Sequence, residues 1–226
     1  MNSLQDRYIR LKAEIAVLQQ TFIQPRPVTL IAVSKSQPIE SIRVLYELGQ
    51  RDFGENYSQE LIEKDHQLTA QGCTDIRWHF IGHLQTNKIR TLLPLLHCIH
   101  SVDSVRVATE ISKRWRALDQ QRRFPVFLEI NLDAEATKQG FSPIALKAHI
   151  NELRQLDALE LCGLMCIPSA NQDCTSRFAQ LKELEQSLRP STQGQLSMGM
   201  SNDYAVAIQE GSTHIRVGTA LFGFRH

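Results

Sequence analysis

The sequence has few cysteines, and no two of them have the spacing of a metal or redox motif. Five cysteines are scattered over 226 residues, and no pair is separated by two residues. An odd number without such a pair argues against a disulfide framework and a zinc motif. Cys162 and Cys166 share one face of a predicted strand, which favours packing over metal binding. We therefore expect reduced cysteines, no metal site and a cytoplasmic location.

Long apolar runs and an excess of one charge are also missing. No segment approaches the roughly 20 apolar residues that cross a bilayer, and the charged N-terminus does not read as a signal peptide. The 25 lysines and arginines balance 24 acids, which gives a formal net charge of +1. The densest basic stretch, at 113–116 and 122–123, is typical of a solvated helix end. We expect no membrane anchor and no nucleic-acid-binding surface.

What the sequence does contain is an alternation of strand-like and helix-like segments. An apolar stripe predicts a helix over residues 1–24 that packs on the rest of the chain. Eight apolar runs then predict strands at 28–33, 51–54, 76–81, 97–102, 126–132, 159–167, 195–198 and 213–217. The stretches between them predict helices at 38–48, 57–68, 104–118, 142–156, 174–188 and 203–209.

This alternation places the chain in the α/β class. Strands that alternate with helices indicate a parallel sheet with helices outside it. Eight units in about 200 residues fit a compact (β/α)8 TIM barrel, with a doubly wound open sheet as the alternative. No linker or low-complexity tract interrupts the pattern, so residues 1–226 are expected to form a single domain.

The segment "LIAVSK" ends the first predicted strand with a lysine, at the end of the strand where barrels carry their functional groups. At strand spacing, the Lys35 side chain shares the inward face of Ile31 and Val33. Desolvation among apolar side chains favours a neutral amine, the nucleophile of Schiff-base chemistry. The alternative is an ion pair between Lys35 and a rim carboxylate such as Glu55.

The last predicted strand leads into a candidate phosphate site. Arg216, Val217, Gly218 and Thr219 precede "ALFG", which reads as one helical turn. A glycine that opens a helix leaves backbone N–H groups and a positive dipole end for an anion. Ser201, after the preceding strand, can add a hydroxyl donor. Helix capping explains the motif equally well, but with an inward lysine it indicates a phosphorylated carbonyl compound held as an imine.

Six motifs resemble, in order and spacing, those of the pyridoxal phosphate homeostasis proteins, which are single-domain relatives of the alanine racemase barrel (fold type III). They are "AVSK", "FGENY", "WHFIGHLQTNK", "GLMCIP", "LSMGMSNDY" and "IRVGTALFG", from about residue 28 to residue 224. The resemblance implies that Lys35 carries pyridoxal 5'-phosphate (PLP) as a Schiff base. It implies that Ser201, Gly218 and Thr219 hold the phosphate, and that Arg216 faces the pyridine nitrogen.

Three further residues receive assignments, and a fourth receives none. The resemblance implies that Asn56, the asparagine of "GEN", lies near the cofactor, and that Met165 lies on a strand end beside it. Lys138 in "EATKQG" is the candidate secondary amine that accepts the PLP aldehyde during transfer. His83 stands where the family pattern varies, and we give it no role.

Two functions remain open at this point. The resemblance implies a carrier or buffer in vitamin B6 homeostasis, without efficient catalysis, that supplies PLP-dependent apo-enzymes; whether other B6 vitamers bind is left open. The alternative is an amino-acid racemase or other PLP enzyme of the alanine racemase type. A lysine aldolase without cofactor ranks last, because it gives no reason for Arg216 beside a phosphate site.

A racemase needs a base on each face of the substrate carbon. Alanine racemases take the second base, a tyrosine, from a further domain, and we expect none here because only three residues follow Gly223. Tyr57 and Tyr204 fall near the predicted rim, but nothing in the sequence places either opposite Lys35. No second subunit is needed to complete the site, so a monomer is expected.

Overall fold

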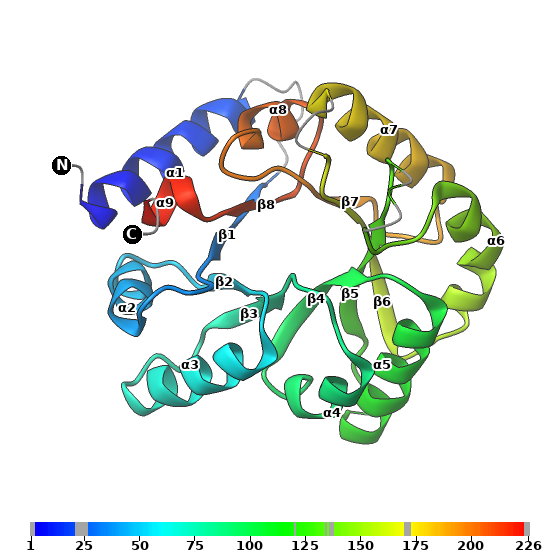
Figure 1. The fold of residues 1–226 in the computed structure, drawn as a ribbon, viewed down its shortest axis with the longest axis horizontal. Helices are drawn as coiled ribbons and strands as arrows, with labels where there is room; N and C mark the ends of the chain where they lie inside the picture. Colours follow the sequence, from blue (N-terminus) through cyan, green and yellow to red (C-terminus); the bar gives the residue numbers. More distant parts are fainter. Residues whose placement is uncertain are drawn as a thin grey trace.

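The computed structural model describes residues 3–20, 27–119, 121–133, 135, 138–169 and 173–223. Its sheet is a closed barrel in which each strand pairs with the next in chain order and β8 pairs with β1. Helices surround the barrel (Figure 1). The strands are β1 (Thr29–Val33), β2 (Asp52–Glu55), β3 (Arg77–Phe80), β4 (Leu96–Val102), β5 (Phe124–Ile130), β6 (Leu159–Cys166), β7 (Gln195–Ser197) and β8 (His214–Val217).

The helices fill the segments between these strands. They are α1 (Leu4–Gln20), α2 (Ile39–Glu47), α3 (Ser58–Ala70), α4 (Ile89–Leu92), α5 (Val105–Leu118), α6 (Pro143–Arg154), α7 (Cys174–Ser187), α8 (Tyr204–Gln209) and α9 (Thr219–Phe222), with a 3-10 turn η1 (Thr86–Lys88). Among the described residues, no helix combines the length and the apolar character that crossing a bilayer requires.

The predicted (β/α)8 barrel is confirmed, and the pairing of β8 with β1 excludes the open sheet. Each strand predicted from the sequence, and each helix predicted between strands, starts and ends within two residues of its observed bounds. The N-terminal helix is confirmed over Leu4–Gln20, while residues 1–2 and 21–24 of that prediction lie outside the described residues. The turn η1 and helix α4 were not predicted, because four residues are too few to show a helical period.

Local sequence explains where several helices begin. The Ser104 and Ser142 hydroxyls accept backbone N–H groups in the first turns of α5 and α6. Pro143 occupies the first turn of α6, where its missing N–H costs nothing. The Asp173 carboxylate accepts two N–H groups at the start of α7. Each cap satisfies donors that the helix itself leaves unpaired.

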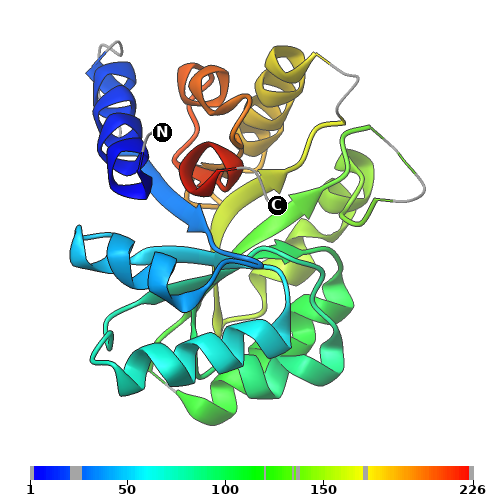
Figure 2. The ribbon, with the colours of Figure 1, turned by 60° about the vertical axis from the view of Figure 1, so that its left-hand side comes forward.

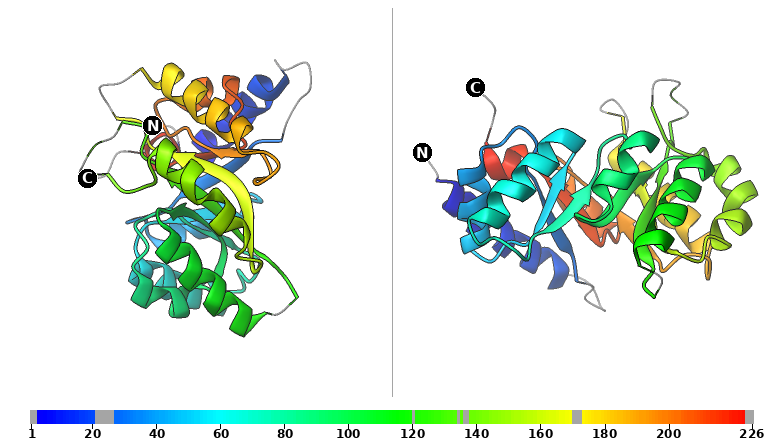
Figure 3. Two further views of the ribbon diagram at one scale, coloured as in Figure 1. Left: turned by 90° about the vertical axis from the view of Figure 1, so that its right-hand side faces the viewer. Right: turned by 90° about the horizontal axis from the view of Figure 1, so that it is seen from below.

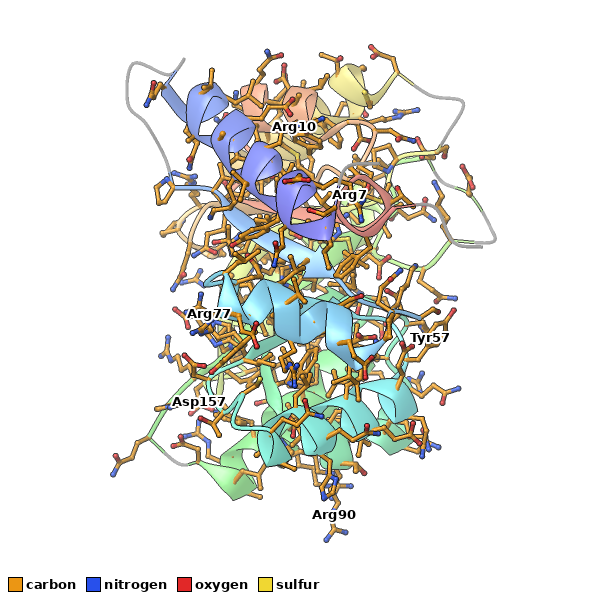
Figure 4. The ribbon with its side chains drawn as sticks, turned by 90° about the vertical axis from the view of Figure 1, so that its left-hand side faces the viewer. Arg7, Arg10, Tyr57, Arg77, Arg90 and Asp157 are labelled. Carbon is orange, nitrogen blue, oxygen red and sulfur yellow. The ribbon has the colours of Figure 1, made fainter. Side chains whose placement is uncertain are left out.

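Helix α1 is joined to the C-terminal end of the chain. It buries Tyr8, Leu11 and Ile15 and contacts α2, α8 and α9. Figures 2 and 3 show α1 beside α9 in several orientations. The Arg7 guanidinium donates to the carbonyl oxygens of Leu221 at 2.6 Å and Phe222 at 2.9 Å (Figure 4). The extra helix therefore packs on the short helix that follows the last strand.

The pairing between β7 and β8 continues beyond the short strand β7. Strand β7 has three residues and shares with β8 the single paired position Ser197↔His214. Backbone hydrogen bonds extend this pairing, from Met198 N–H to the carbonyl oxygen of His214 at 3.1 Å and from Arg216 N–H to that of Gly199 at 2.9 Å. On its other side, β8 shares four paired positions with β1, from Thr29↔His214 to Ala32↔Val217, which closes the barrel.

Candidate functional site

A cavity of about 560 Å³ opens at the carboxyl ends of the strands, beyond β1, β2, β3, β6, β7 and β8. This volume lies within the usual range for small-molecule sites. Six residues predicted from the sequence line it together: Lys35, Asn56, Ser201, Arg216, Gly218 and Thr219. The folded chain thus brings residues 35 and 219 to one site, although they are far apart in the sequence.

The backbone before Lys35 is held by a buried ion pair. The Lys64 Nζ donates to the carbonyl oxygen of Ser34 at 2.6 Å and to Glu55 Oε1 at 2.8 Å. The Ser34 hydroxyl donates to the same Glu55 oxygen at 2.7 Å. Both charged side chains are almost completely buried, with exposed fractions of 7% for Lys64 and 0% for Glu55. Glu55, which the sequence analysis named as a possible partner of Lys35, therefore forms an ion pair with Lys64.

The backbone after Lys35 adopts an uncommon conformation. Ser36 has a φ of 59°, in the left-handed region that favours glycine. Its N–H donates to Glu60 Oε1, an oxygen that also accepts from Lys64 at 2.7 Å. Strained backbone persists only where its surroundings fix it, and it is concentrated at functional sites. Lys35 thus lies between two fixed points, Ser34 and Ser36.

On the cavity wall beyond β7 and β8, the Ser201 hydroxyl lies at the start of α9. Its oxygen accepts the N–H of Gly218 at 3.2 Å and that of Ala220 at 3.1 Å. Ser201 therefore caps α9, and helix capping was the alternative explanation of this motif in the sequence. The N–H of Gly218 already donates to this hydroxyl oxygen. The Ser201 hydroxyl keeps its own hydrogen, so we expect it to be the first donor that an anion meets here.

Arg216 brings a buried positive charge to the cavity wall. It is 4% exposed, and its guanidinium donates to Ser197 Oγ at 2.7 Å and to the carbonyl oxygen of Cys166 at 3.0 Å. Burial lowers the pKa of Arg216 from its usual value. A guanidinium has five N–H donors and no acceptor, so any atom that it meets in the cavity must accept.

Asn56 offers an unsatisfied polar atom at the same site. Its side-chain Oδ1 is buried and has no hydrogen-bond partner among the described residues. The backbone of Asn56 also explains Gly82, because a Cβ at Gly82 would lie 2.2 Å from the Asn56 carbonyl oxygen. Buried polar atoms are nearly always paired. An orphaned oxygen at a cavity wall is therefore suited to a donor on a ligand.

A second cavity of about 210 Å³ adjoins the first and shares Asn56, Ile81 and Ile167 with it. Lys138 lines this smaller cavity. Its Nζ donates to Ser169 Oγ at 2.7 Å and lies 3.2 Å from Asp133 Oδ2. The Lys138 amine is therefore held by polar groups of the rim, one cavity away from the predicted Lys35 site.

Glu129, which sequence reasoning missed, also lines the smaller cavity. Burial, and then the negative charge of Asp103, raise its pKa to about 7, against the opposing effect of Arg216. A glutamate at an inward position of a strand in "FLEI" was the available signal. Perturbed carboxyls of this kind are concentrated at functional sites.

Two residues from the sequence analysis lie elsewhere or stay without a role. Met165 has no exposed surface and, within the described structure, lines neither cavity. It belongs to a buried cluster with Cys98, Phe127 and Cys162, and its place beside the cofactor stays a prediction. His83 is about half exposed and lies 3.4 Å from Asp103 Oδ2. It lines the smaller cavity, and we still assign it no role.

Comparison with known proteins shows the family to which this chain belongs. The family model of the alanine racemase N-terminal domain matches residues 8–226. Two curated relatives carry the name pyridoxal phosphate homeostasis protein. The one from Pseudomonas aeruginosa is 38% identical over 229 residues, covering 100% of this chain and 97% of that protein. The human one is 39% identical over 218 residues, covering 90% and 78%.

Two solved structures are similar to this chain over most of its length. PipY from Synechococcus elongatus, solved with PLP bound, has a TM-score of 0.86 and 36% identity over 98% of this chain and 100% of that one. Alanine racemase from Corynebacterium glutamicum has a TM-score of 0.70 at 15% identity, which shows the fold alone. It aligns with 94% of this chain but 60% of the racemase chain. By its motifs, its barrel and these relatives, the chain belongs to the pyridoxal phosphate homeostasis protein family.

Proposed function

We propose that this protein binds PLP as a Schiff base with Lys35 and acts in vitamin B6 homeostasis as a carrier or buffer, without efficient catalysis. The single observation that carries the proposal is the cavity of about 560 Å³ that Lys35, Ser201 and Arg216 line together. An amine, a hydroxyl at a helix start and a buried guanidinium match the aldehyde, phosphate and ring nitrogen of PLP. The PLP-bound PipY structure supports the same ligand for this chain.

The residues present fit the cofactor in further respects. Ser201 keeps its hydroxyl hydrogen to donate, because both of its backbone contacts use the oxygen as acceptor. Thr219 opens α9 and lines the cavity beside it. The orphaned Oδ1 of Asn56 marks a place where a polar ligand group would be satisfied. We expect these three residues, with the backbone of Gly218, to orient the cofactor.

The charge of Arg216 favours a carrier over an enzyme. When bound, PLP supplies an electron sink, which is strongest when its ring nitrogen is protonated. Arg216 can only donate, so it must face an unprotonated nitrogen, and the sink is weakened.

The tyrosines support the same conclusion. Burial, and then a hydrogen bond with Glu14 of α1, raise the pKa of Tyr204 to about 12. Tyr57 is 59% exposed and lies at the edge of the molecule (Figure 4). Neither tyrosine lines the larger cavity that the described residues form.

One observation keeps the racemase alternative in view. Glu129 lines the adjoining cavity with a pKa raised to about 7, and a group that titrates near neutral pH is suited to proton transfer. Deuterium exchange at the α-carbon of L-alanine and other amino acids, with chiral analysis of the products, separates the two functions. We expect no efficient exchange. Turnover near the median enzyme value of about 10 per second on any amino acid would establish an enzyme.

PLP attachment is tested by absorbance spectra of the PLP-loaded protein before and after borohydride, followed by peptide mapping. We expect a Schiff-base band that borohydride removes and a stable adduct on the peptide containing Lys35. Lys35→Ala should lose both, whereas Lys147→Ala, on an exposed position of α6, should keep both. An undiminished band in Lys35→Ala would overturn the assignment.

The proposal also covers the transfer of PLP to apo-enzymes, the oligomeric state and the cellular location. Lys138, in the adjoining cavity, is proposed to accept the aldehyde during transfer to apo-enzymes. We propose that the protein works as a monomer in the cytoplasm. Its five cysteines are all free thiols, which supports a reducing compartment.

A further inference from the structure

The interior of the barrel holds a chain of polar side chains that the cofactor site does not explain. His79 on β3 and His100 on β4 are buried, and Nδ1 of His79 lies 2.9 Å from Nε2 of His100. Nδ1 of His100 lies 2.8 Å from Ser197 Oγ, and Arg216 Nη1 donates to the same oxygen at 2.7 Å. At the far end, His79 Nε2 lies 3.1 Å from Oδ1 of Asp52. Five side chains from five strands are therefore joined by four consecutive hydrogen bonds.

The residues at the two ends of this chain of hydrogen bonds can each take one role, either donor or acceptor. Arg216 can only donate. Burial alone would raise the pKa of Asp52, but hydrogen bonds from Arg77 and His79 outweigh it and hold that pKa well below its usual value. Asp52 is thus a carboxylate and can only accept. In Figure 4, Arg77, the ion-pair partner of Asp52, marks the amino ends of the strands, and Tyr57, at the opposite edge of the view, marks their carboxyl ends. The chain of hydrogen bonds therefore starts near the amino ends of the strands and reaches the cavity at their carboxyl ends.

With one proton on each ring, a single arrangement satisfies every contact. Asp52 must accept from Nε2–H of His79, which leaves His79 Nδ1 to accept from Nε2–H of His100. His100 Nδ1 must then accept the hydroxyl hydrogen of Ser197, whose oxygen in turn accepts from Arg216. Burial lowers the pKa of His100 well below its usual value, so this ring is neutral. Phe127 stacks on it with ring centroids 4.5 Å apart, which fixes its plane.

We propose that Asp52, His79, His100 and Ser197 are positioning residues that form a polarised hydrogen-bond relay, with the proton on Nε2 of both rings, and thereby fix the Arg216 guanidinium at the cavity wall. Every bond in the relay points the same way, so each dipole presents its negative end to Arg216. Aligned hydrogen bonds in a low-dielectric interior strengthen one another. The effect on a cofactor rests on the function proposed above, whereas the relay itself does not.

The same atoms could instead be read as metal ligands. His79, Cys98 and His100 bring three ligand atoms within 4.8 Å of one another. A metal would require both facing nitrogens, His79 Nδ1 and His100 Nε2, to be unprotonated. The relay requires a proton on one of them. The position of that proton therefore decides between the two.

Nitrogen NMR of the histidine rings in the cofactor-free, full-length protein measures this position directly. Long-range ¹H–¹⁵N spectra at neutral pH should show His79 and His100 as Nε2–H tautomers, assigned through His79→Gln and His100→Gln. A proton on Nδ1 of either ring would overturn the relay. So would two unprotonated facing nitrogens or a doubly protonated His79. None of these outcomes depends on whether PLP binds.

Whether the relay acts on Arg216 is tested with Ser197→Ala. The matched control is Ser212→Ala, which removes another buried hydroxyl that donates only to backbone carbonyls, such as that of Met198 at 2.7 Å. In protein with ¹⁵N-labelled arginine, Ser197→Ala should shift the Arg216 side-chain signals and let the guanidinium rotate, and Ser212→Ala should not. PLP should bind about tenfold more weakly to Ser197→Ala, and within about twofold of the parent to Ser212→Ala. Identical Arg216 signals in the two variants would overturn the positioning role, whatever the cofactor does.

The far end of the relay gives a second test that avoids the cavity. Asp52→Asn keeps the shape of the side chain but removes its charge, and its control is Asp75→Asn, which removes an exposed carboxylate paired with Arg51. We expect Asp52→Asn to move the ring-nitrogen shifts of both His79 and His100, and the control to move neither. A change confined to His79 would show that the bonds are not coupled and would overturn the relay.

Discussion

The Nζ of Lys64 lies 2.6 Å from the carbonyl oxygen of Ser34, the residue that precedes Lys35. Lys64 thus fixes the backbone that positions the predicted Schiff-base lysine, and it does so from inside a buried ion pair with Glu55. The carbonyl group of Ser34 is therefore the point at which this ion pair holds the chain beside Lys35.

Lys64→Met should destabilise the protein by about 3–5 kcal/mol, because it leaves the buried Glu55 carboxylate without its partner. Urea unfolding measures the loss. Combining Lys64→Met with Glu55→Gln should recover much of the stability, since the uncompensated charge is then gone. A double variant no more stable than Lys64→Met alone would show that the ion pair is not the cause.

Ser201→Ala should weaken PLP binding by tenfold or more, because a hydrogen bond to a charged group contributes about 1.5–3 kcal/mol. Affinity for pyridoxal, which lacks the phosphate, should already be low and should change little in this variant. Fluorescence or absorbance titration with both ligands measures the difference. An equal loss for the two ligands would place the anion site elsewhere.

Gly218→Ala should separate ligand binding from folding. A Cβ at Gly218 would come no closer than 3.6 Å to Val33, so the fold can accept it, but it narrows the approach to the predicted phosphate. We expect a nearly unchanged Tm and weaker PLP binding. The contrasting variant is Gly199→Ala, where φ is +95° and the new Cβ would lie 2.5 Å from Ala207 Cβ. That variant should lose stability first, as seen in thermal unfolding.

Glu129 should make stability depend on pH. Its pKa rises from 4.5 to about 7 on folding, so the folded state holds the proton more tightly than the unfolded state. Its contribution is therefore complete below about pH 4.5 and is lost as the pH rises through 7. In Glu129→Gln the free energy of unfolding should fall less across this window than in the parent. Glu183→Gln, on an exposed position of α7, should behave as the parent does.

Lys138→Ala should slow delivery of PLP to an apo-enzyme while leaving the Lys35 Schiff-base band intact, if Lys138 is the secondary amine. The control is Lys182→Ala, which removes a lysine on α7 that lines neither described cavity. Stopped-flow transfer to an apo-enzyme gives the rates. Equal rates in the parent and Lys138→Ala would remove Lys138 from the transfer route.

The sequence predicted the fold in detail because its apolar runs alternate regularly with helix-like segments. It also predicted six residues that line the larger cavity, because strand ends in a barrel converge on one rim. It did not indicate that Met165 packs with Cys98 and Phe127, because an irregular register between β5 and β6 alters which residues of these strands face inward. Nor could it pair Lys64 with Ser34, since that contact depends on how α3 packs against the barrel.

The hydrogen bonds that continue the β7–β8 pairing past the end of β7 bear on how a bound molecule leaves. The loops that follow these two strands carry Ser201 and Gly218, and the hydrogen bond between them comes after the one from Arg216 N–H to the Gly199 carbonyl oxygen. Opening this last hydrogen bond is a local event, whose free energy is a fraction of that of global unfolding. A phosphate bound at Ser201 would add a contact between the loops after β7 and β8, so that the barrel with ligand would open less easily here than the barrel without it. The free energy of ligand release and the free energy of opening this part of the barrel would then rise together.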